Sequence, residues 1–107
     1  MSDIDDSDFK LYRNMLPLWQ ESYMKKLISE YQELLSSDDD ASKKFWELER
    51  RINTDKRFTG VASSVSKSDM IFKLLDLLNS DVITTNDLSI FSDELRKRIE
   101  LFRNIEF

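Results

Sequence analysis

Apolar residues recur at a helical spacing through the first third of the chain. They stand three or four positions apart, at a mean step of 3.6, and comprise Leu16, Trp19, Tyr23, Leu27, Tyr31 and Leu34. A mean step of 3.6 residues is typical of one face of a straight amphipathic helix and not of a coiled-coil seam. We therefore expect a helix over 17–36, with Pro17 in its first turn, where proline is best tolerated, and a shorter helical lead-in over 9–15.

A second amphipathic helix is expected after an acidic connector at 36–40. It begins near Ala41, because the aspartates before it suit the positive end of a helix dipole. Its inward positions are Phe45, Leu48, Glu49 and Ile52, with Trp46 one step round the helix. Gly60, the single glycine, is interpreted as the stop signal just past this helix. Since they belong to or border inward stripes, Trp19 and Trp46 are both expected to be at least partly buried.

The middle of the chain predicts a buried third helix. Ser66 and Asp69 match a variant capping box, in which the serine caps the helix and the aspartate reaches back. The residues that follow are apolar on nearly every side of a helix, and comprise Met70, Ile71, Leu74, Leu75, Leu77 and Leu78. A helix with so little polar surface is typical of the centre of a domain.

The C-terminal part predicts a short helix and then a longer one. Thr84 and Asp87 offer another cap, which opens a short helix through Leu88 and Phe91. The last helix starts at 92–94. Its inward residues are Leu95, Ile99 and Phe102, and its outward residues are Arg96, Lys97, Arg98 and Arg103.

Together these patterns predict an all-α protein, a compact single-domain bundle of four to five helices over 9–107. Period-two alternation is absent, and only one glycine and one proline interrupt the chain. Residues 1–8 are expected to form an acidic, disordered tail, since they hold four aspartates and only Ile4 as an apolar anchor. Deleting this tail is therefore expected to leave the folded domain intact.

Composition argues against several kinds of chemistry. The chain has no histidine and no cysteine, so it lacks the usual general base near neutral pH, a thiol nucleophile and the usual ligands of zinc. Segment 76–87 places aspartates at the first and twelfth positions of a calcium loop. Its third position is Leu78, however, and its sixth is Asp81, where such a loop needs glycine. We therefore expect no enzymatic activity, no cofactor and no metal.

Hydropathy indicates a soluble protein, and the absence of cysteine indicates a cytoplasmic one. The net charge is −5, and seven of the 21 acidic residues lie in the tail and in 38–40. The remaining 14 acids face 16 bases, so the rest of the chain has no overall attraction to nucleic acid or anionic lipid. The N-terminus lacks the basic segment of a secretory signal, and the apolar runs are far shorter than the ~20 residues of a membrane span.

The strongest polar candidate is a basic surface with interleaved aromatics on the second helix. Its residues are Lys43, Lys44, Trp46, Arg50, Arg51, Lys56 and Arg57. Cations beside aromatic rings are typical of nucleic-acid surfaces, but aromatics at helical spacing are more often core residues. Basic side chains on an exposed helix are also more often simply solvated. The sequence thus favours a small helical protein-interaction or regulatory protein, with a nucleic-acid-binding regulator as the alternative.

The apolar residues exceed what so short a bundle needs for its own core. The helix over 17–36 carries them on a broad arc that includes Ile28 and Leu35. The last helix adds Leu101, Phe102, Ile105 and Phe107. Large exposed apolar patches usually mark interfaces. We therefore predict a homodimer, with the first or the last helix in the interface.

Three segments carry a resemblance to a known family. They are 16–24 (LPLWQESYM), 44–52 (KFWELERRI) and 91–95 (FSDEL), and the turn at 58–61 (FTGV) fits the same pattern. In these segments the chain resembles a family of short uncharacterised bacterial proteins, which are cytosolic, all-helical and without an established activity. The resemblance covers most of the chain from around residue 15. It implies a bacterial cytosolic setting, but no reaction, cofactor or partner.

Overall fold

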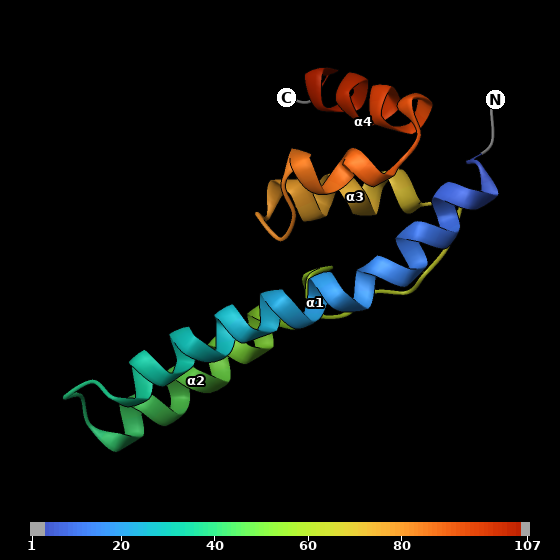
Figure 1. Ribbon diagram of the computed structural model, residues 1–107. Coiled ribbons are helices and arrows are strands. Elements are labelled where there is room, and N and C mark those ends of the chain that lie inside the picture. Colours follow the sequence, from blue (N-terminus) through green and yellow to red (C-terminus); the bar gives the residue numbers. More distant parts are fainter. Residues whose placement is uncertain (1–3, 106–107) are drawn as a thin grey trace.

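A computed structural model describes residues 4–105 and contains five helices in that range (Figure 1). They are α1 (Asp6–Leu35), α2 (Ala41–Asp55), α3 (Met70–Asn79), the 3-10 helix η1 (Thr85–Ile90) and α4 (Asp93–Ile105). No strand occurs between residues 4 and 105. The all-α class and the helical bundle expected from the sequence are confirmed, with four substantial helices.

Helix α1 joins two parts of the molecule. Its first half packs with α3, η1 and α4 into a body (residues 4–20 and 59–105). Its second half pairs with α2 to form an arm (residues 21–58) that points away from the body (Figure 1). The molecule measures 55 × 29 × 22 Å, and its radius of gyration is 16.7 Å, against about 13 Å for a compact chain of similar length. The projecting arm makes the bundle elongated rather than compact.

The hydrophobic core lies in the body. Its buried side chains are Tyr12, Leu16, Trp19, Met70, Ile71, Leu74, Leu77, Leu78, Ile83, Leu88, Phe91, Leu95 and Ile99. Five of them come from α3, in agreement with its predicted central position. Trp19 is buried as expected, and its ring centroid lies 6.5 Å from that of Phe91.

Helix α1 is longer than the sequence pattern indicated, because it begins at Asp6 and continues through Pro17. The expected division into a lead-in and a main helix is wrong, and Pro17 lies inside a 30-residue helix. A proline here removes the hydrogen bond that the carbonyl of Arg13 would accept. Both residues are exposed, so water is able to bond that carbonyl. Leu16 and Trp19, buried on either side of Pro17, hold the helix against the core.

The acidic N-terminal segment is part of the fold. Asp8 is 3% exposed, and its carboxylate accepts hydrogen bonds from the backbone N–H of Ser92 at 2.9 Å and from its hydroxyl at 2.6 Å. The Ser92 hydroxyl oxygen in turn accepts the N–H of Leu95 at 3.2 Å, which caps α4. The predicted disordered tail is therefore wrong for 6–8, which are helical and tie α1 to α4. Residues 1–3 lie outside the described part.

One of the two predicted capping boxes forms. The backbone N–H of Thr84 donates to the carboxylate of Asp87 at 2.7 Å, and the box opens η1 as expected. The other box is wrong, because α3 begins one residue after Asp69, which makes no side-chain cap. The hydroxyl of Ser66 accepts the N–H of Ser68 instead, at 3.3 Å.

Gly60 serves close packing rather than the end of α2, which stops five residues earlier. A Cβ on Gly60 would lie 2.7 Å from Cδ2 of Tyr23 and 2.7 Å from Cγ2 of Val82. The missing side chain therefore lets this turn fit between α1 and the loop that follows α3. The side-chain amide of Gln20 anchors the same turn by donating to the carbonyl of Thr59 at 2.8 Å.

Candidate interaction surface

A polar seam between α1 and α2 holds the arm together. Asp55 is the one buried residue of α2, and its carboxylate accepts a hydrogen bond from the hydroxyl of Tyr31 at 2.6 Å. Arg51 donates to Glu30 at 2.6 Å and lies 3.6 Å from Asp55. Its guanidinium also lies 5.3 Å from the ring centre of Tyr31. These hydrogen bonds and charge contacts therefore join α2 to α1, together with the buried Leu27 and the half-buried Leu34 and Leu48.

The seam fixes the protonation of its own groups. Removal from water and then the hydrogen bond to Asp55 raise the pKa of Tyr31 to about 12. Burial and then the charge of Asp55 also raise the pKa of Tyr23. The hydrogen bond to Glu30 raises the pKa of Arg51 above its usual value. The Tyr31 hydroxyl therefore keeps its proton, and its hydrogen bond to Asp55, to a higher pH than a phenol in water.

Phe45 and Ile52 lie on a different side of α2 from the seam. Arg51 and Asp55 are four positions apart and share a face of α2, which also holds the half-buried Leu48. Ile52 comes one position after Arg51 and is therefore turned about 100° round the helix, and Phe45, seven positions before Ile52, lies on the same side as Ile52. The expectation that Phe45, Glu49 and Ile52 face inward is therefore wrong, because all three are exposed, and of the four expected inward positions only Leu48 is half-buried.

Four exposed apolar side chains gather on one side of the arm, and we call them the arm face. They are Ile28 and Leu35 on α1, 53% and 46% exposed, and Phe45 and Ile52 on α2, 63% and 43% exposed. The two residues on each helix are seven positions apart and so lie on the same side of it. Because α1 and α2 run antiparallel, Ile28 lies level with Ile52, and Leu35 with Phe45.

A shallow pocket of about 230 Å³ marks the inner end of the arm face. It is lined by Met24, Leu27, Ile28, Tyr31, Ile52, Asp55, Lys56 and Val61. Most of these side chains are apolar, and the volume suits one large aliphatic or aromatic side chain. Pockets that receive a single buried apolar anchor are typical of the centres of protein interfaces.

The structure separates the seven residues that were predicted to form a basic surface. Four of them line a hollow near the start of α2, namely Lys43, Lys44, Trp46 and Arg50. Arg51 lies in the seam, Lys56 lines the apolar pocket, and Arg57 is exposed beyond the end of α2. The expectation that Trp46 is partly buried is wrong, because it is 62% exposed on the side of α2 opposite the seam.

The hollow at the start of α2 carries both signs of charge. Asp39 and Glu47 line it together with the cations. Nε of Arg50 donates to Glu47 at 2.9 Å, which raises the pKa of Arg50 and lowers that of Glu47. The indole of Trp46 packs edge-on against Phe45, with ring centroids 4.9 Å apart. This surface therefore offers an exposed aromatic ring among mixed charges rather than a continuous basic face.

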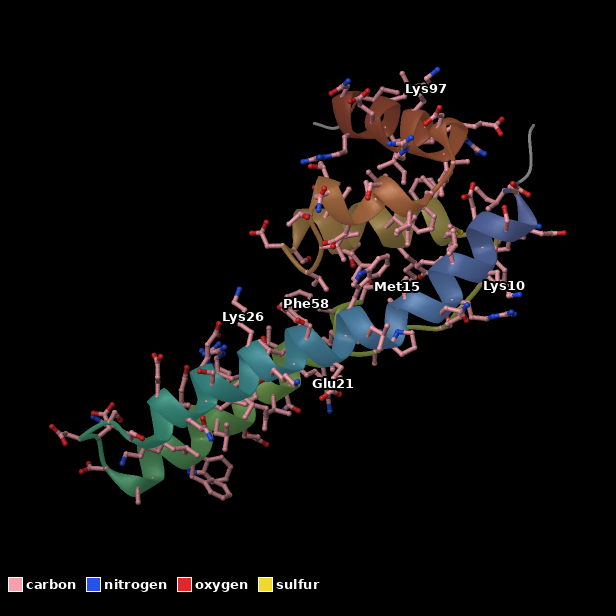
Figure 2. The ribbon with its side chains drawn as sticks, viewed as in Figure 1. Lys10, Met15, Glu21, Lys26, Phe58 and Lys97 are labelled. Atoms are coloured by element: carbon pink, nitrogen blue, oxygen red, sulfur yellow. The ribbon has the colours of Figure 1, made fainter. Side chains whose placement is uncertain are left out.

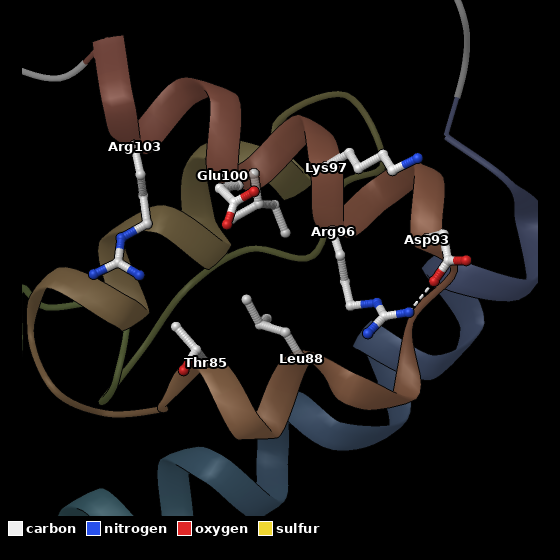
Figure 3. Close-up of a pocket in the computed structure, with 8 residues that line it drawn as sticks. Thr85, Leu88, Asp93, Arg96, Lys97, Glu100 and Arg103 are labelled. Atoms are coloured by element: carbon white, nitrogen blue, oxygen red, sulfur yellow. Dashed lines mark hydrogen bonds and ion pairs between the residues drawn. The ribbon is translucent and has the colours of Figure 1, made fainter.

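A second cleft, of about 370 Å³, lies in the body between η1 and α4 (Figure 3). It is lined by Thr85, Leu88, Asp93, Arg96, Lys97, Ile99, Glu100 and Arg103. Figure 3 shows Arg96 and Arg103 extending from α4 toward η1. Asp93 and Glu100 are both exposed, and Asp93 is paired with Arg96. Neither carboxylate of the cleft thus has the burial that tunes a general acid or base.

The described residues hold no group of three or more acidic side chains placed to bind a metal ion. None of the helices within 4–105 has the length and apolar character needed to cross a membrane. Comparisons with known proteins give no match to a family model, to a curated protein or to a solved structure. The family resemblance therefore stays a prediction, and the functional argument depends on the geometry of the arm.

Proposed function

We propose that this chain is a small protein-interaction or regulatory protein, without catalytic activity of its own, that binds through the arm face. The observation that carries the proposal concerns α2, whose residues are all described and include no buried apolar side chain. Yet Phe45, Leu48 and Ile52 are spaced to form an apolar face. Exposed apolar surface of this kind, rimmed by polar residues, marks interaction sites.

Energetics support a bound state of the arm. Covering the part of Phe45 or Ile52 that is exposed, 63% and 43%, contributes about 1–2 kcal/mol for each side chain. A helix of 15 residues is only marginally stable by itself in water, and a surface ion pair such as that of Arg50 with Glu47 adds little. The partner that fits is an amphipathic helix, since one of its apolar side chains would fill the pocket between Ile28 and Ile52.

A bacterial, cytoplasmic setting belongs to the same proposal, and we propose a homodimer separately, since binding through the arm face does not require one. The setting follows from the cysteine-free composition and the family resemblance. For the homodimer, both helices named from the sequence offer apolar surface. Helix α1 contributes half of the arm face, and α4 exposes Leu101, Phe102 and Ile105. The ring of Phe102 lies 5.8 Å from that of Phe72 on α3.

Nucleic-acid binding is the alternative, and one observation favours it. Trp46 is exposed beside Lys43 and Arg50, and an exposed indole among cations stacks readily on single-stranded bases. The acidic Asp39 and Glu47 in the same hollow weaken the local attraction for phosphates. Under this alternative, an oligothymidine would quench the emission of Trp46 but not that of the buried Trp19. Unchanged emission in low salt would rule it out.

Photo-cross-linking in the cell tests the interaction directly. A photoreactive amino acid at position 45 should yield defined cross-links to protein. The matched control carries the same group at position 72, since Phe45 and Phe72 are each 63% exposed but lie on the arm and the body respectively. Products from position 45 that are absent from position 72 support the arm face. No product from position 45, or the same products from both positions, contradicts the proposal.

A further inference from the structure

We infer that the partner on the arm face is the arm of a second copy of this chain, so that two arms pack into one four-helix bundle. The inference rests on the proposed function and names its partner. Each copy uses the same four side chains, Ile28, Leu35, Phe45 and Ile52, as a two-fold symmetric interface requires.

The arm face has the dimensions of one layer of such a bundle. Helix α2 has 15 residues and is therefore about 22 Å long, and two packed helices are about 20 Å wide. Two hairpins of this size cover each other along their whole length when they stack face to face. The footprint of one layer is therefore about 440 Å². Side chains that project from it raise the accessible surface above this footprint, which is within a factor of about two of the ~800 Å² per partner of a standard interface.

The arm needs cover whenever the chain is folded. Between residues 21 and 58, all of which are described, Leu27 is the single buried apolar side chain. The other buried apolar residues belong to the body and do not cover α2. A transient partner would leave α2 uncovered between encounters. A second copy is present wherever the chain is made, so it is the occupant that gives permanent cover.

The charges around the arm face allow two identical surfaces to meet. On α1, Glu21 and Lys25 lie seven and three positions before Ile28 and are exposed. On α2, Glu49 and Lys56 lie within one turn of Ile52 and are exposed as well. Each helix thus carries one acid and one base at the rim, and the centre is apolar. Along the two helices, like surfaces therefore approach without net repulsion, and acid is able to meet base across the rim. The exposed aspartates at 38–40 lie beyond the arm face, at the tip of the arm.

The direction of the arm face also permits this approach. Figure 2 shows Glu21 pointing away from α3 and α4, with Lys26 on the opposite side of α1. Glu21 and Ile28 are seven positions apart and share a side of α1. The arm face is therefore turned away from the body, and a second arm reaches it without a collision with α3 or α4.

Sedimentation equilibrium at micromolar concentration tests the pairing. The wild type should give twice the 12.7 kDa mass of one chain. Phe45→Glu and Ile52→Glu should give the monomer mass while circular dichroism still shows a helical protein, because both side chains are exposed in one copy. The control Phe72→Glu introduces the same charge at an equally exposed position and should remain dimeric. A monomeric wild type, or a dimeric Phe45→Glu variant, overturns the inference.

Chemical cross-linking gives a second readout that does not depend on the glutamate variants. Because the chain has no cysteine, one introduced cysteine reacts with a short bis-maleimide to link only two copies. Ile52→Cys should yield a covalent dimer, and Phe72→Cys should not. The reverse result places the contact on the body and overturns the inference. A monomeric chain that still cross-links from position 45 to a different protein overturns self-pairing but supports the proposed function.

Discussion

At the residue scale, the two tryptophans have the same side chain but differ in burial. Trp19 is buried against Phe91, and Trp46 is exposed on the arm. We expect Trp19→Ala to lower the free energy of unfolding by ~3 kcal/mol or more, because it removes a large ring from a packed core. Trp46→Ala should change it by less than ~0.5 kcal/mol. Urea denaturation followed by circular dichroism measures both, and equal losses would show that Trp46 also supports the fold.

Tyr12 makes the stability of the body sensitive to alkaline pH. Burial first, and then the charge of Asp69, raise the pKa of Tyr12 from 10.0 to about 12, and its hydroxyl is buried without a hydrogen-bond partner. The folded state therefore favours the protonated phenol. The stabilisation that the protonated Tyr12 gives the folded state is fully present below pH 10 and is lost as the pH rises toward 12. The reason is that the unfolded chain releases this proton at a lower pH than the folded chain.

The expected result is a wild-type unfolding free energy that decreases between pH 10 and pH 12. Tyr12→Phe should reduce this decrease, because phenylalanine has no proton to release, and should cause little loss at pH 7, because no hydrogen bond is removed. Urea titrations at several pH values compare the two proteins. Identical pH dependence in both would show that Tyr12 is not the responsible group.

At the scale of elements, Asp8 connects helices that are far apart in the sequence. We expect Asp8→Ala to lower the free energy of unfolding by about 2–3 kcal/mol, because two hydrogen bonds to a buried carboxylate are lost and the donors of Ser92 are left unpaired. Deleting 1–8 should likewise lower the melting temperature, contrary to the expectation from the sequence. Asp6→Ala is the control, since Asp6 pairs with Lys67 at the surface. Equal melting temperatures for the two variants would contradict this assignment.

The sequence correctly predicted the helices that supply the apolar core of the body. Helix α3 is apolar on most sides and so had to be central, and the spacing of Leu95 and Ile99 correctly gave the inward side of α4. The expectation that Phe102 also faces inward is wrong, because it lies one turn beyond Ile99, the last core residue of α4, and is 37% exposed. The link from Asp8 to Ser92 could not be predicted, because it spans 84 positions and polar residues carry no periodic signal of their partner. Pro17 was assigned to the first turn of a helix because proline is best tolerated there. In the structure the burial of its neighbours Leu16 and Trp19 keeps the helix continuous through Pro17 instead.

The candidate site was likewise predicted only in part from the sequence. Spacing indicated correctly that Phe45 and Ile52 share a side of α2, but periodicity does not say what covers that side. The sequence predicted that this side faces inward, whereas Arg51 and Asp55 hold α1 on the adjoining side of α2 through Glu30 and Tyr31. Two pairs of apolar residues at a spacing of seven, on consecutive antiparallel helices, are the signal from which the arm face is recognisable.

At the scale of the whole molecule, the arm and the body differ in how they are stabilised. The body buries a contiguous apolar core, so opening α3 exposes most of the surface that folding hides. The arm depends on a polar seam and on the occupant of the arm face. Local opening of α2 in a single copy is therefore expected to need far less free energy than opening of α3.

Hydrogen exchange followed by mass spectrometry measures this difference. Amides of α2 should exchange faster than those of α3 in dilute protein, and should slow as the concentration rises into the range where two arms pair. Amides of α3 should not depend on concentration. In Phe45→Glu the exchange of α2 should stay fast at every concentration, because the charge at the arm face prevents pairing. Equal and concentration-independent protection of α2 and α3 in the wild type would mean that one copy holds its arm as firmly as its core.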